Sequence, residues 1–261
     1  MKTYISSSFV LLLFGLFSSC EKVIDIQASD DIDKLVIEGL INTNSTEQSF
    51  KLSKNISLST VNSYPAVSGA TVIVHDSDKN EYVFKETTPG TYIAKDFQGL
   101  SGKNYSMLVR VDEKQFSATS QLPEAVRLDS IKAEKPALGD KDTRHIKVFY
   151  KDPAEQQNFY RFVIYINDQQ AKDIYALNDD FNNGNQVSLT LRPADVDIYP
   201  GDKIRVEMIC IDKAVYNYFY SLMQQSTGAG VTPSNPPSNI SPTVLGYFSA
   251  QCSSSKTIQV D

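Results

Sequence analysis

The sequence contains no tryptophan and only two histidines among its 261 residues. A sugar-binding platform of stacked indole rings is therefore disfavoured, although fourteen tyrosines offer other aromatic surfaces. His75 and His145 lie in separate predicted strands, and neither has the partners of a zinc site or a Ser-His-Asp triad nearby in the sequence. No glycine-rich loop follows a predicted strand and opens a helix, as nucleotide binding would require. We therefore expect a protein that is not an enzyme and that holds no metal or cofactor.

Long hydrophobic segments are also scarce. The apolar run Val10–Phe17 is too short to cross about 30 Å of hydrocarbon as a helix, and with Lys2 before it the run is typical of a secretory signal. It ends in Ser18, Ser19 and Cys20, which resembles the lipobox at which bacterial lipoproteins are cleaved and acylated. We predict a signal peptide over 1–19, a lipid (palmitate) anchor on Cys20 and a tether over 20–33, since several acyl chains hold a protein firmly to a bilayer. The alternative is a plain secretory signal with an incidental cysteine.

Positive charge is not in excess either. Without residues 1–19 the chain carries 24 basic and 31 acidic side chains, a net charge near −7. This balance argues against nucleic acid as a partner and against electrostatic adsorption to anionic lipid.

Apart from Cys20, the chain has two cysteines, Cys210 and Cys252. Each is in phase with the apolar residues of a predicted strand, and thiols of exported proteins tend to be oxidised. The sequence leaves open whether they form a disulfide or stay as two buried thiols. No Cys-x-x-Cys motif is present, so redox catalysis is not expected.

From residue 34 the chain consists of short runs with period-two alternation, separated by turn residues. Such runs predict strands over 35–41, 48–53, 69–76, 81–85, 91–94, 104–111 and 115–120. Strands of this number and spacing are typical of an immunoglobulin-like or transthyretin-like β-sandwich, which we expect over residues 34–122.

Pro123 marks a junction, because proline cannot donate to a strand ladder. Beyond it, residues 123–261 predict a second β-rich domain with strands over 128–134, 145–151, 158–167, 186–191, 203–212, 243–250 and 256–260. The strand 158–167 is apolar on both faces and is expected to be central. Tyr216, Phe219, Tyr220 and Met223 recur at helical spacing, which predicts an amphipathic helix over 213–225 packed on the sheet. The expected fold is mainly β, with two β-sandwich domains and this one short helix.

A loop over 226–242, rich in Gly, Ser, Pro and Asn, follows the helix. Long loops in compact domains are usually functional or mobile, and a stiff proline-rich loop loses little entropy on docking. We predict a partner-binding surface made of the loop and two aromatic residues after it: Asn235, Pro236, Pro237, Ser238, Asn239, Tyr247 and Phe248. The alternative is that these residues only seal the end of the C-terminal sandwich.

Three short motifs have modest predictive value. Asp152 precedes a proline in a turn and is expected to accept backbone hydrogen bonds. The segment 179–184 resembles a calcium loop, but Phe181 stands where an oxygen ligand is required, so we predict a polar hairpin tip without metal. Asp129-Ser130-Ile131 resembles a tripeptide signal for O-glycosylation, which makes Ser130 a candidate site.

Several blocks of the sequence together resemble a bacterial lipoprotein family, domain of unknown function 4249, which is common in the Bacteroidetes group. The blocks are Cys20-Glu21-Lys22, residues 35–39, 67–72, 89–92, 150–154, 158–162 and 178–181, Gly201-Asp202 leading to Ile211-Asp212, and residues 235–240 and 245–250. The resemblance covers nearly the whole chain. It implies an outer-membrane lipoprotein, often encoded beside a TonB-dependent receptor, and it supplies no catalytic residues.

Together these observations predict a lipid-anchored binding protein of the cell envelope, accessory to a TonB-dependent outer-membrane transporter in nutrient uptake. Its expected partners are outer-membrane lipid, through Cys20, and the receptor. Glu21 and Asp25 only partly match the acidic export signal of surface lipoproteins, so a periplasmic and a surface-exposed position both stay open. The rival hypothesis is a structural or adhesive surface lipoprotein without a role in transport.

Overall fold

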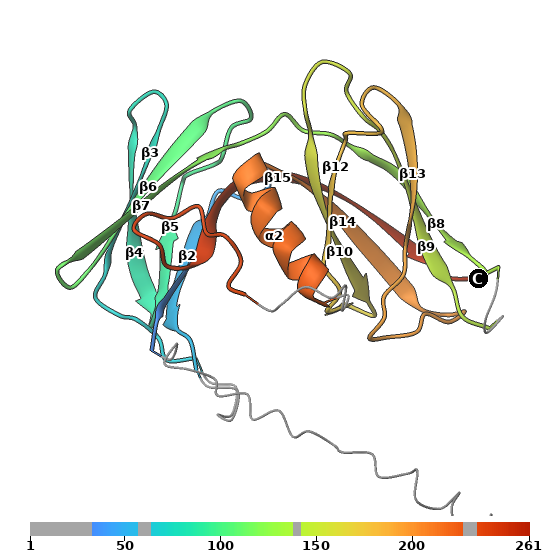
Figure 1. The fold of residues 1–261 in the computed structure, drawn as a ribbon, viewed down its shortest axis with the longest axis horizontal. Coiled ribbons are helices and arrows are strands. Elements are labelled where there is room, and N and C mark those ends of the chain that lie inside the picture. The colour runs from blue at the N-terminus through green and yellow to red at the C-terminus, as the bar shows by residue number, and fades with distance from the viewer. Residues whose placement is uncertain (1–32, 57–63, 138–141, 227–233) are drawn as a thin grey trace, which may run out of the picture. The chain divides into compact units, whose positions relative to one another are not determined.

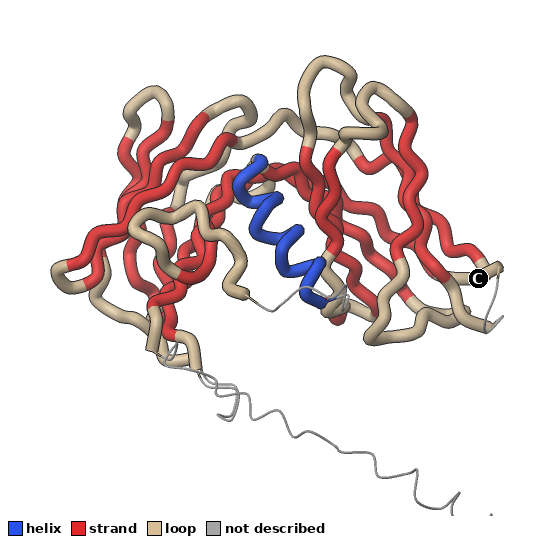
Figure 2. The backbone as a smooth tube through the Cα atoms, viewed as in Figure 1, coloured by secondary structure: helices blue, strands red, loops and turns tan. Residues whose placement is uncertain are grey.

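Short alternating segments form the strands of the protein, which we describe from a computed structural model for residues 33–56, 64–137, 142–226 and 234–261. The strands of the first half are β1 (Leu35–Asn42), β2 (Gln48–Lys54), β3 (Thr71–Asp76), β4 (Glu81–Thr88), β5 (Thr91–Ala94), β6 (Asn104–Val111) and β7 (Lys114–Gln121). The second half contains β8 (Leu128–Glu134), β9 (His145–Lys151), β10 (Phe159–Ile166), β11 (Gln169–Gln170), β12 (Tyr175–Asn178), β13 (Gln186–Leu191), β14 (Lys203–Ile211), the helix α2 (Lys213–Ser226) and β15 (Leu245–Gln259). Figures 1 and 2 show that strands dominate. The predicted mainly-β class with one helix is therefore confirmed for the described residues.

The strands form one long path and one small sheet. The path runs β11-β10-β14-β15-β1-β2-β5-β4-β3-β6-β7, with β12 also paired to β10, and the small sheet has the order β13-β9-β8. Between β4 and β5 the register shifts at Glu86 and Thr88, where a bulge interrupts the ladder. Bulges bend strands, so this one helps the path to fold back on itself.

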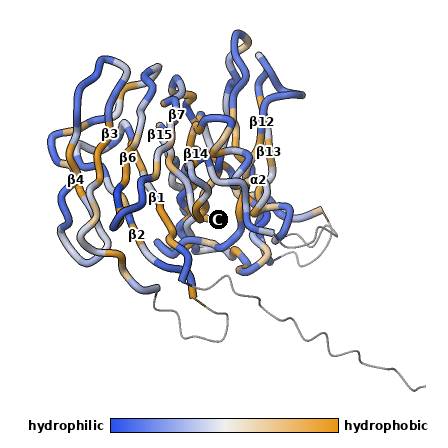
Figure 3. The backbone as a smooth tube through the Cα atoms, turned by 60° about the vertical axis from the view of Figure 1, so that its left-hand side comes forward, coloured by the Kyte–Doolittle hydropathy of each residue, from blue (hydrophilic) through white to orange (hydrophobic). Residues whose placement is uncertain are grey.

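In the first half of the chain, aromatic side chains from different strands of the long path pack against one another in the core. Phe50 of β2 meets Phe84 of β4 edge-on, with ring centroids 4.9 Å apart. Phe50 also stacks on Phe248 of β15 at 5.7 Å. Figure 3 shows hydrophobic residues concentrated on the strands and hydrophilic ones in the turns. Packing of two sheets face to face in this way is a sandwich arrangement.

In the second half, β10 is buried on both faces, as the sequence predicted. Tyr160 and Phe162 point towards the small sheet, where Tyr150 of β9 lies 5.1 Å and 6.0 Å from their ring centroids. Phe159 and Val163 point the other way and belong to a separate apolar cluster with Val215 and other residues of α2. The helix predicted for residues 213–225 is thus confirmed, although Tyr220 of its aromatic stripe is 40% exposed.

The last strand, β15, is a single strand of fifteen residues. This corrects the prediction of two strands over 243–250 and 256–260: Ser253, Ser254 and Ser255 stay in the ladder because they pair with Ile209, Met208 and Glu207 of β14. Polar residues with weak strand propensity are held extended here by their neighbour.

The two halves of β15 have different partners. Residues Leu245–Gln251 pair in parallel with β1, and Cys252–Gln259 pair antiparallel with β14. β15 therefore belongs to the sheets of both predicted domains, and the described residues lie in one compact unit. The predicted division at residues 122 and 123 stays a prediction. No helix in the described ranges is long and apolar enough to cross a membrane.

Candidate functional site

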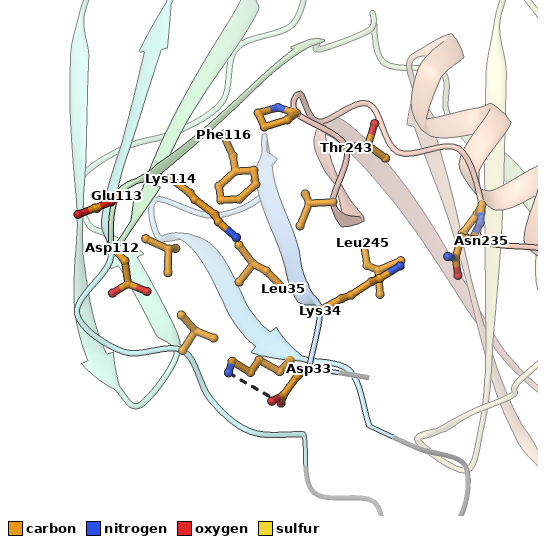
Figure 4. A pocket seen from close by; sticks show the side chains of 16 residues that line it. Asp33, Lys34, Leu35, Asp112, Glu113, Lys114, Phe116, Asn235, Thr243 and Leu245 are labelled. Atoms are coloured by element: carbon orange, nitrogen blue, oxygen red, sulfur yellow. Dashed lines mark ion pairs between the residues drawn. The ribbon is translucent and has the colours of Figure 1, made fainter. Parts of the chain in front are cut away.

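A pocket of about 1020 Å³ opens where β1 and β7 begin and where β2 and β6 end. Its lining residues are 33–35 at the start of β1, Lys54 at the end of β2, Val67, the turn 111–114 with Phe116, and residues 235–236 and 242–245 ahead of and into β15. Figure 4 shows their side chains around a common space. The pocket is thus built at one end of the N-terminal sandwich, with one wall supplied from the far end of the sequence.

The interior of this pocket is mostly apolar. Its apolar lining residues are Leu35, Val67, Val111, Phe116, Pro236, Pro242, Val244 and Leu245. Phe116 and Val244 are 6% and 9% exposed, so only their inner edges meet the cavity. Apolar walls with a few polar groups are typical of small-molecule sites, and a cavity of this size could hold a drug-sized ligand.

Charged side chains of both signs surround the pocket. They are Asp33, Lys34, Lys54, Asp112, Glu113 and Lys114. Lys54 Nζ and Asp33 Oδ1 form an ion pair at 3.8 Å, and both side chains are substantially exposed, so the pair contributes little to stability. Because three side chains of each sign are present, the rim favours a ligand with an apolar body and polar edges over a polyanion or a polycation.

The sixteen residues that line the pocket include no histidine, cysteine, serine or tyrosine. His75 lies elsewhere, on β3, with its Nε2 3.2 Å from Glu81 Oε2 at an exposed position. His145 lies on β9, where burial and the charge of Arg192 lower the pKa of its imidazole. In the ranges that the structure covers, no group of three or more His, Cys, Asp or Glu side chains could hold a metal ion. The arrangement, an apolar interior with charged side chains around it, is suited to binding.

The predicted partner-binding residues have different positions. Asn235 and Pro236 line the pocket, and Pro237 beside them is exposed. Asn239 instead binds the backbone of β15, with Nδ2 donating to Phe248 O at 2.7 Å and Oδ1 accepting from Phe248 N at 3.0 Å. The Ser238 hydroxyl donates to Gly246 O at 2.8 Å. Ser238 and Asn239 therefore stand in for a strand partner, which matches the alternative that they seal the sandwich.

The two aromatic residues of that prediction are buried. Phe248 has no exposed surface and packs on Phe50, so it offers no contact area to a partner, and the prediction is wrong for this residue. Tyr247 is 9% exposed and packs against Tyr218 and Phe219 of α2 at 4.9 Å and 5.0 Å. It also lines a smaller pocket of about 280 Å³ together with Glu38 and Lys51. Alternation in an isolated strand could not reveal that α2 covers one face of β15 and the first sandwich the other.

The remaining predicted sites are placed as follows. Cys210 and Cys252 lie directly opposite each other in the β14–β15 ladder, and both are buried free thiols in the structure. The hydrogen bond with Cys210 and burial raise the pKa of Cys252. The disulfide between them stays a prediction, as does glycosylation of Ser130, which is exposed on β8. Cys20 lies outside the described residues.

Sequence reasoning missed most of the pocket. Leu35, Phe116 and Val244 each read as ordinary strand residues, and nothing local distinguishes them. Two of the pocket's charged residues, Asp33 and Asp112, have φ of 65° and 52° in the left-handed region, which only the structure reveals. The pocket depends on how segments distant in the sequence converge.

Known proteins provide one informative comparison. No curated protein matches the sequence. Similar solved structures include a DUF4785 family protein from Legionella pneumophila (7% identity, TM-score 0.27, 68% of this chain and 52% of that one) and the Yersinia pseudotuberculosis adhesin InvE (17%, 0.21, 67% and 55%). The chain spans about half the length of these proteins, and at such TM-scores they support no inference about function. The model of the family described as domain of unknown function (DUF4249) matches residues 21–257, so the chain belongs to that family.

Proposed function

We propose that this protein is a lipid-anchored binding protein of the cell envelope, accessory to a TonB-dependent outer-membrane transporter in nutrient uptake. The observation that carries the proposal is the pocket of about 1020 Å³ with an apolar interior and a charged rim. Such a pocket is suited to holding a ligand and passing it on unchanged. The mixed rim favours an amphipathic nutrient or a peptide segment over a highly charged one.

The tether supports this proposal by limiting how far the pocket can lie from a membrane. Asp33 lines the pocket and lies thirteen positions after Cys20 in the sequence, with twelve residues between them. A fully extended chain spans about 3.4 Å per residue, so the pocket lies within about 45 Å of an acyl group on Cys20. Acylation of Cys20 would therefore keep the pocket within reach of a transporter in the same membrane.

Co-purification tests the accessory role. The tagged protein, expressed natively and solubilised in detergent, is expected to bring down an outer-membrane β-barrel when it is captured through its tag. Thr243→Trp places a large ring in the pocket and is expected to reduce recovery of the β-barrel at least about tenfold, if the partner or its ligand uses the pocket. Thr190→Trp is the matched control, because Thr190 is an exposed threonine on β13, outside the pocket.

Two outcomes would contradict the proposal. If no β-barrel is recovered with the wild type, and deletion of the gene leaves nutrient uptake intact, the structural or adhesive hypothesis is favoured. If Thr190→Trp loses the partner as fully as Thr243→Trp, the pocket is not the binding site.

The lipid anchor is tested separately. Cys20→Ala is expected to move the protein from the membrane fraction to the soluble fraction and to abolish metabolic labelling with a palmitate analogue. Labelling that persists in Cys20→Ala would place the acyl group on another residue.

A further inference from the structure

The core of the C-terminal sandwich ends in a polar cluster. Asp152 continues the inward face of β9, in phase with Ile146, Val148 and Tyr150. Asn158 is in phase with Tyr160 and Phe162 on the inward face of β10, and Asp179 follows β12 in phase with Leu177, which pairs with Tyr160. Three oxygen-bearing side chains therefore extend the facing inner surfaces of two packed sheets into one space.

All three residues are buried: Asp152 is 1% exposed, Asp179 2% and Asn158 4%. Hydrogen bonds connect each of the two aspartates to the start of β10. Asn158 N donates to Asp179 Oδ2 at 2.9 Å, and Tyr160, two residues on, donates its hydroxyl to Asp152 Oδ1 at 2.5 Å. Gly184 N donates to Asp152 Oδ2 at 3.1 Å, which confirms that Asp152 accepts a backbone hydrogen bond. The loop after β9 and the turn after β12 also pack closely, since a Cβ on Gly184 would lie 2.8 Å from the Cβ of Ala154.

The cluster has more negative charge than its neighbours compensate. Among the described residues, no lysine, arginine or histidine pairs with Asp152 or Asp179. The ammonium of the nearby Lys151 donates instead to Gly184 O. Buried carboxylates without a cation are costly.

A second observation points to a ligand. The side-chain oxygen of Asn158, Oδ1, is buried and has no hydrogen-bond partner. This acceptor, on the residue whose backbone N–H contacts Asp179, lacks a donor, and a hard cation held by the three side chains would satisfy it together with the two carboxylates. Carboxylate, amide and backbone carbonyl oxygens are the ligands that Ca²⁺ takes in proteins, with a flexible geometry that loops can supply.

We propose that Asp152, Asp179 and Asn158 form a binding site for a calcium-like divalent cation between the two sheets of the C-terminal sandwich. This site differs from the contiguous calcium loop that Phe181 excludes, because its ligands come from three separate segments. Its role is structural: the cation ties the loop after β9 and the turn after β12 to the start of β10. The proposal does not depend on the pocket or on the lipid anchor.

Calcium titration of the full chain after treatment with a chelator tests this site. We expect a Kd of about 10⁻⁴–10⁻³ M and a rise in Tm of about 3–10 °C at saturating calcium, with ionic strength held constant by NaCl. Tb³⁺ is expected to show luminescence sensitised by Tyr150 and Tyr160, since the chain has no tryptophan, and calcium should displace it.

Variants distinguish the site from a general salt effect. Asp179→Asn is expected to weaken calcium binding at least about tenfold. Asn158→Asp adds a carboxylate, so it should lower the Tm without calcium and increase the rise that calcium produces. Asp168→Asn is the control, because it removes one acidic charge at an exposed ion pair with Lys203.

The proposal is overturned if calcium leaves the Tm of the wild type unchanged, or if Asp179→Asn and Asp168→Asn respond equally to calcium. It is also overturned if Asn158→Asp folds and gains no additional response. A wild type that loses stability as the pH rises above 4, with no effect of calcium, would show that a proton compensates the carboxylates.

Discussion

At the scale of single residues, Gly246 shows how one position constrains the fold. Its φ is +93°, and a Cβ there would lie 2.0 Å from the carbonyl oxygen of Ile37. This is the point where β15 pairs in parallel with β1, so backbone meets backbone and cannot give way. Only glycine allows both the conformation and the close approach.

Gly246→Ala is therefore expected to destabilise the protein by more than about 4 kcal/mol, or to prevent folding. Gly201→Ala is the matched control, because Gly201 has nearly the same φ, +94°, and nothing within 4 Å of its Cβ position. It should cost about 1–2 kcal/mol from backbone strain alone. Chemical denaturation of both variants measures the difference, and equal losses would show that the clash with Ile37 is unimportant.

Asp76 is the second residue with a strong local role. Its carboxylate, 1% exposed, accepts hydrogen bonds from Asn80 N at 3.0 Å, Asn80 Nδ2 at 2.9 Å, Asp78 N at 2.9 Å and Lys103 Nζ at 3.2 Å. Burial alone would raise its pKa, but these hydrogen bonds outweigh burial and hold the pKa at about 2. The carboxylate thus organises the turn between β3 and β4.

This lowered pKa predicts the sign of a pH effect. Because the folded state binds the proton more weakly than the unfolded state, the contribution of Asp76 is complete above about pH 4 and is lost as the pH falls towards 2. It amounts to about 2 kcal/mol. Asp76→Asn should make the free energy of unfolding less dependent on pH in this window. Asp78→Asn should not, because Asp78 is an exposed acid that pairs with the same lysine, Lys103. A wild-type curve that is already flat there would contradict the assignment.

At the scale of elements, Asp212 connects three of them. Its Oδ1 accepts from Val215 N at 2.9 Å and caps the N-terminus of α2. Its Oδ2 accepts from the hydroxyl of Ser120 on β7, and Ser120 Oγ accepts from Ala250 N of β15 at 2.8 Å. The residue that caps the helix thus also fixes where the helix sits on the sheets.

Asp212→Ala is expected to cost about 2 kcal/mol, since it removes the cap and the bond to Ser120. Ser120→Ala should cost about 1–3 kcal/mol, because it leaves the buried N–H of Ala250 without an acceptor. Their losses should not add in the double variant, since both break the same bond. A double-mutant cycle measures this coupling, and additive losses would mean that the Asp212–Ser120 contact is energetically silent.

Elements were also the scale at which the sequence was most informative. The both-face apolar pattern of β10 and the helical spacing of Tyr216 and Phe219 predicted a central strand and a packed helix, and both are present. Local periodicity succeeds here because each element buries a continuous face. It failed at Ser253–Ser255, whose extended conformation comes from β14 and not from their own propensity.

At the scale of the whole molecule, β15 makes the two halves interdependent. Its first half completes the sheet of β1, and its second half completes the sheet of β14. Separation of the halves would expose backbone groups along one or the other ladder. We therefore expect residues 33–261 to unfold as one cooperative unit.

The absence of tryptophan makes this prediction easy to measure. Tyr82→Trp on β4 and Tyr165→Trp on β10 each introduce a single fluorescent reporter, one in each half. Their denaturation curves should share one midpoint and match that of circular dichroism. Two separate midpoints would show that the halves unfold independently, as the predicted division at residue 122 implies.

The sequence alone determined the family, the mainly-β class, nearly all strands and the helix, because these depend on local alternation and short motifs. Only the tertiary structure decided that β15 pairs with β1, which lies about two hundred residues away, that Asn239 completes a strand edge, and that Phe248 is core. It also decided where the pocket lies and which acids meet Asn158. Such features arise where segments distant in sequence converge, and the free energy that holds them comes from contacts no single segment contains.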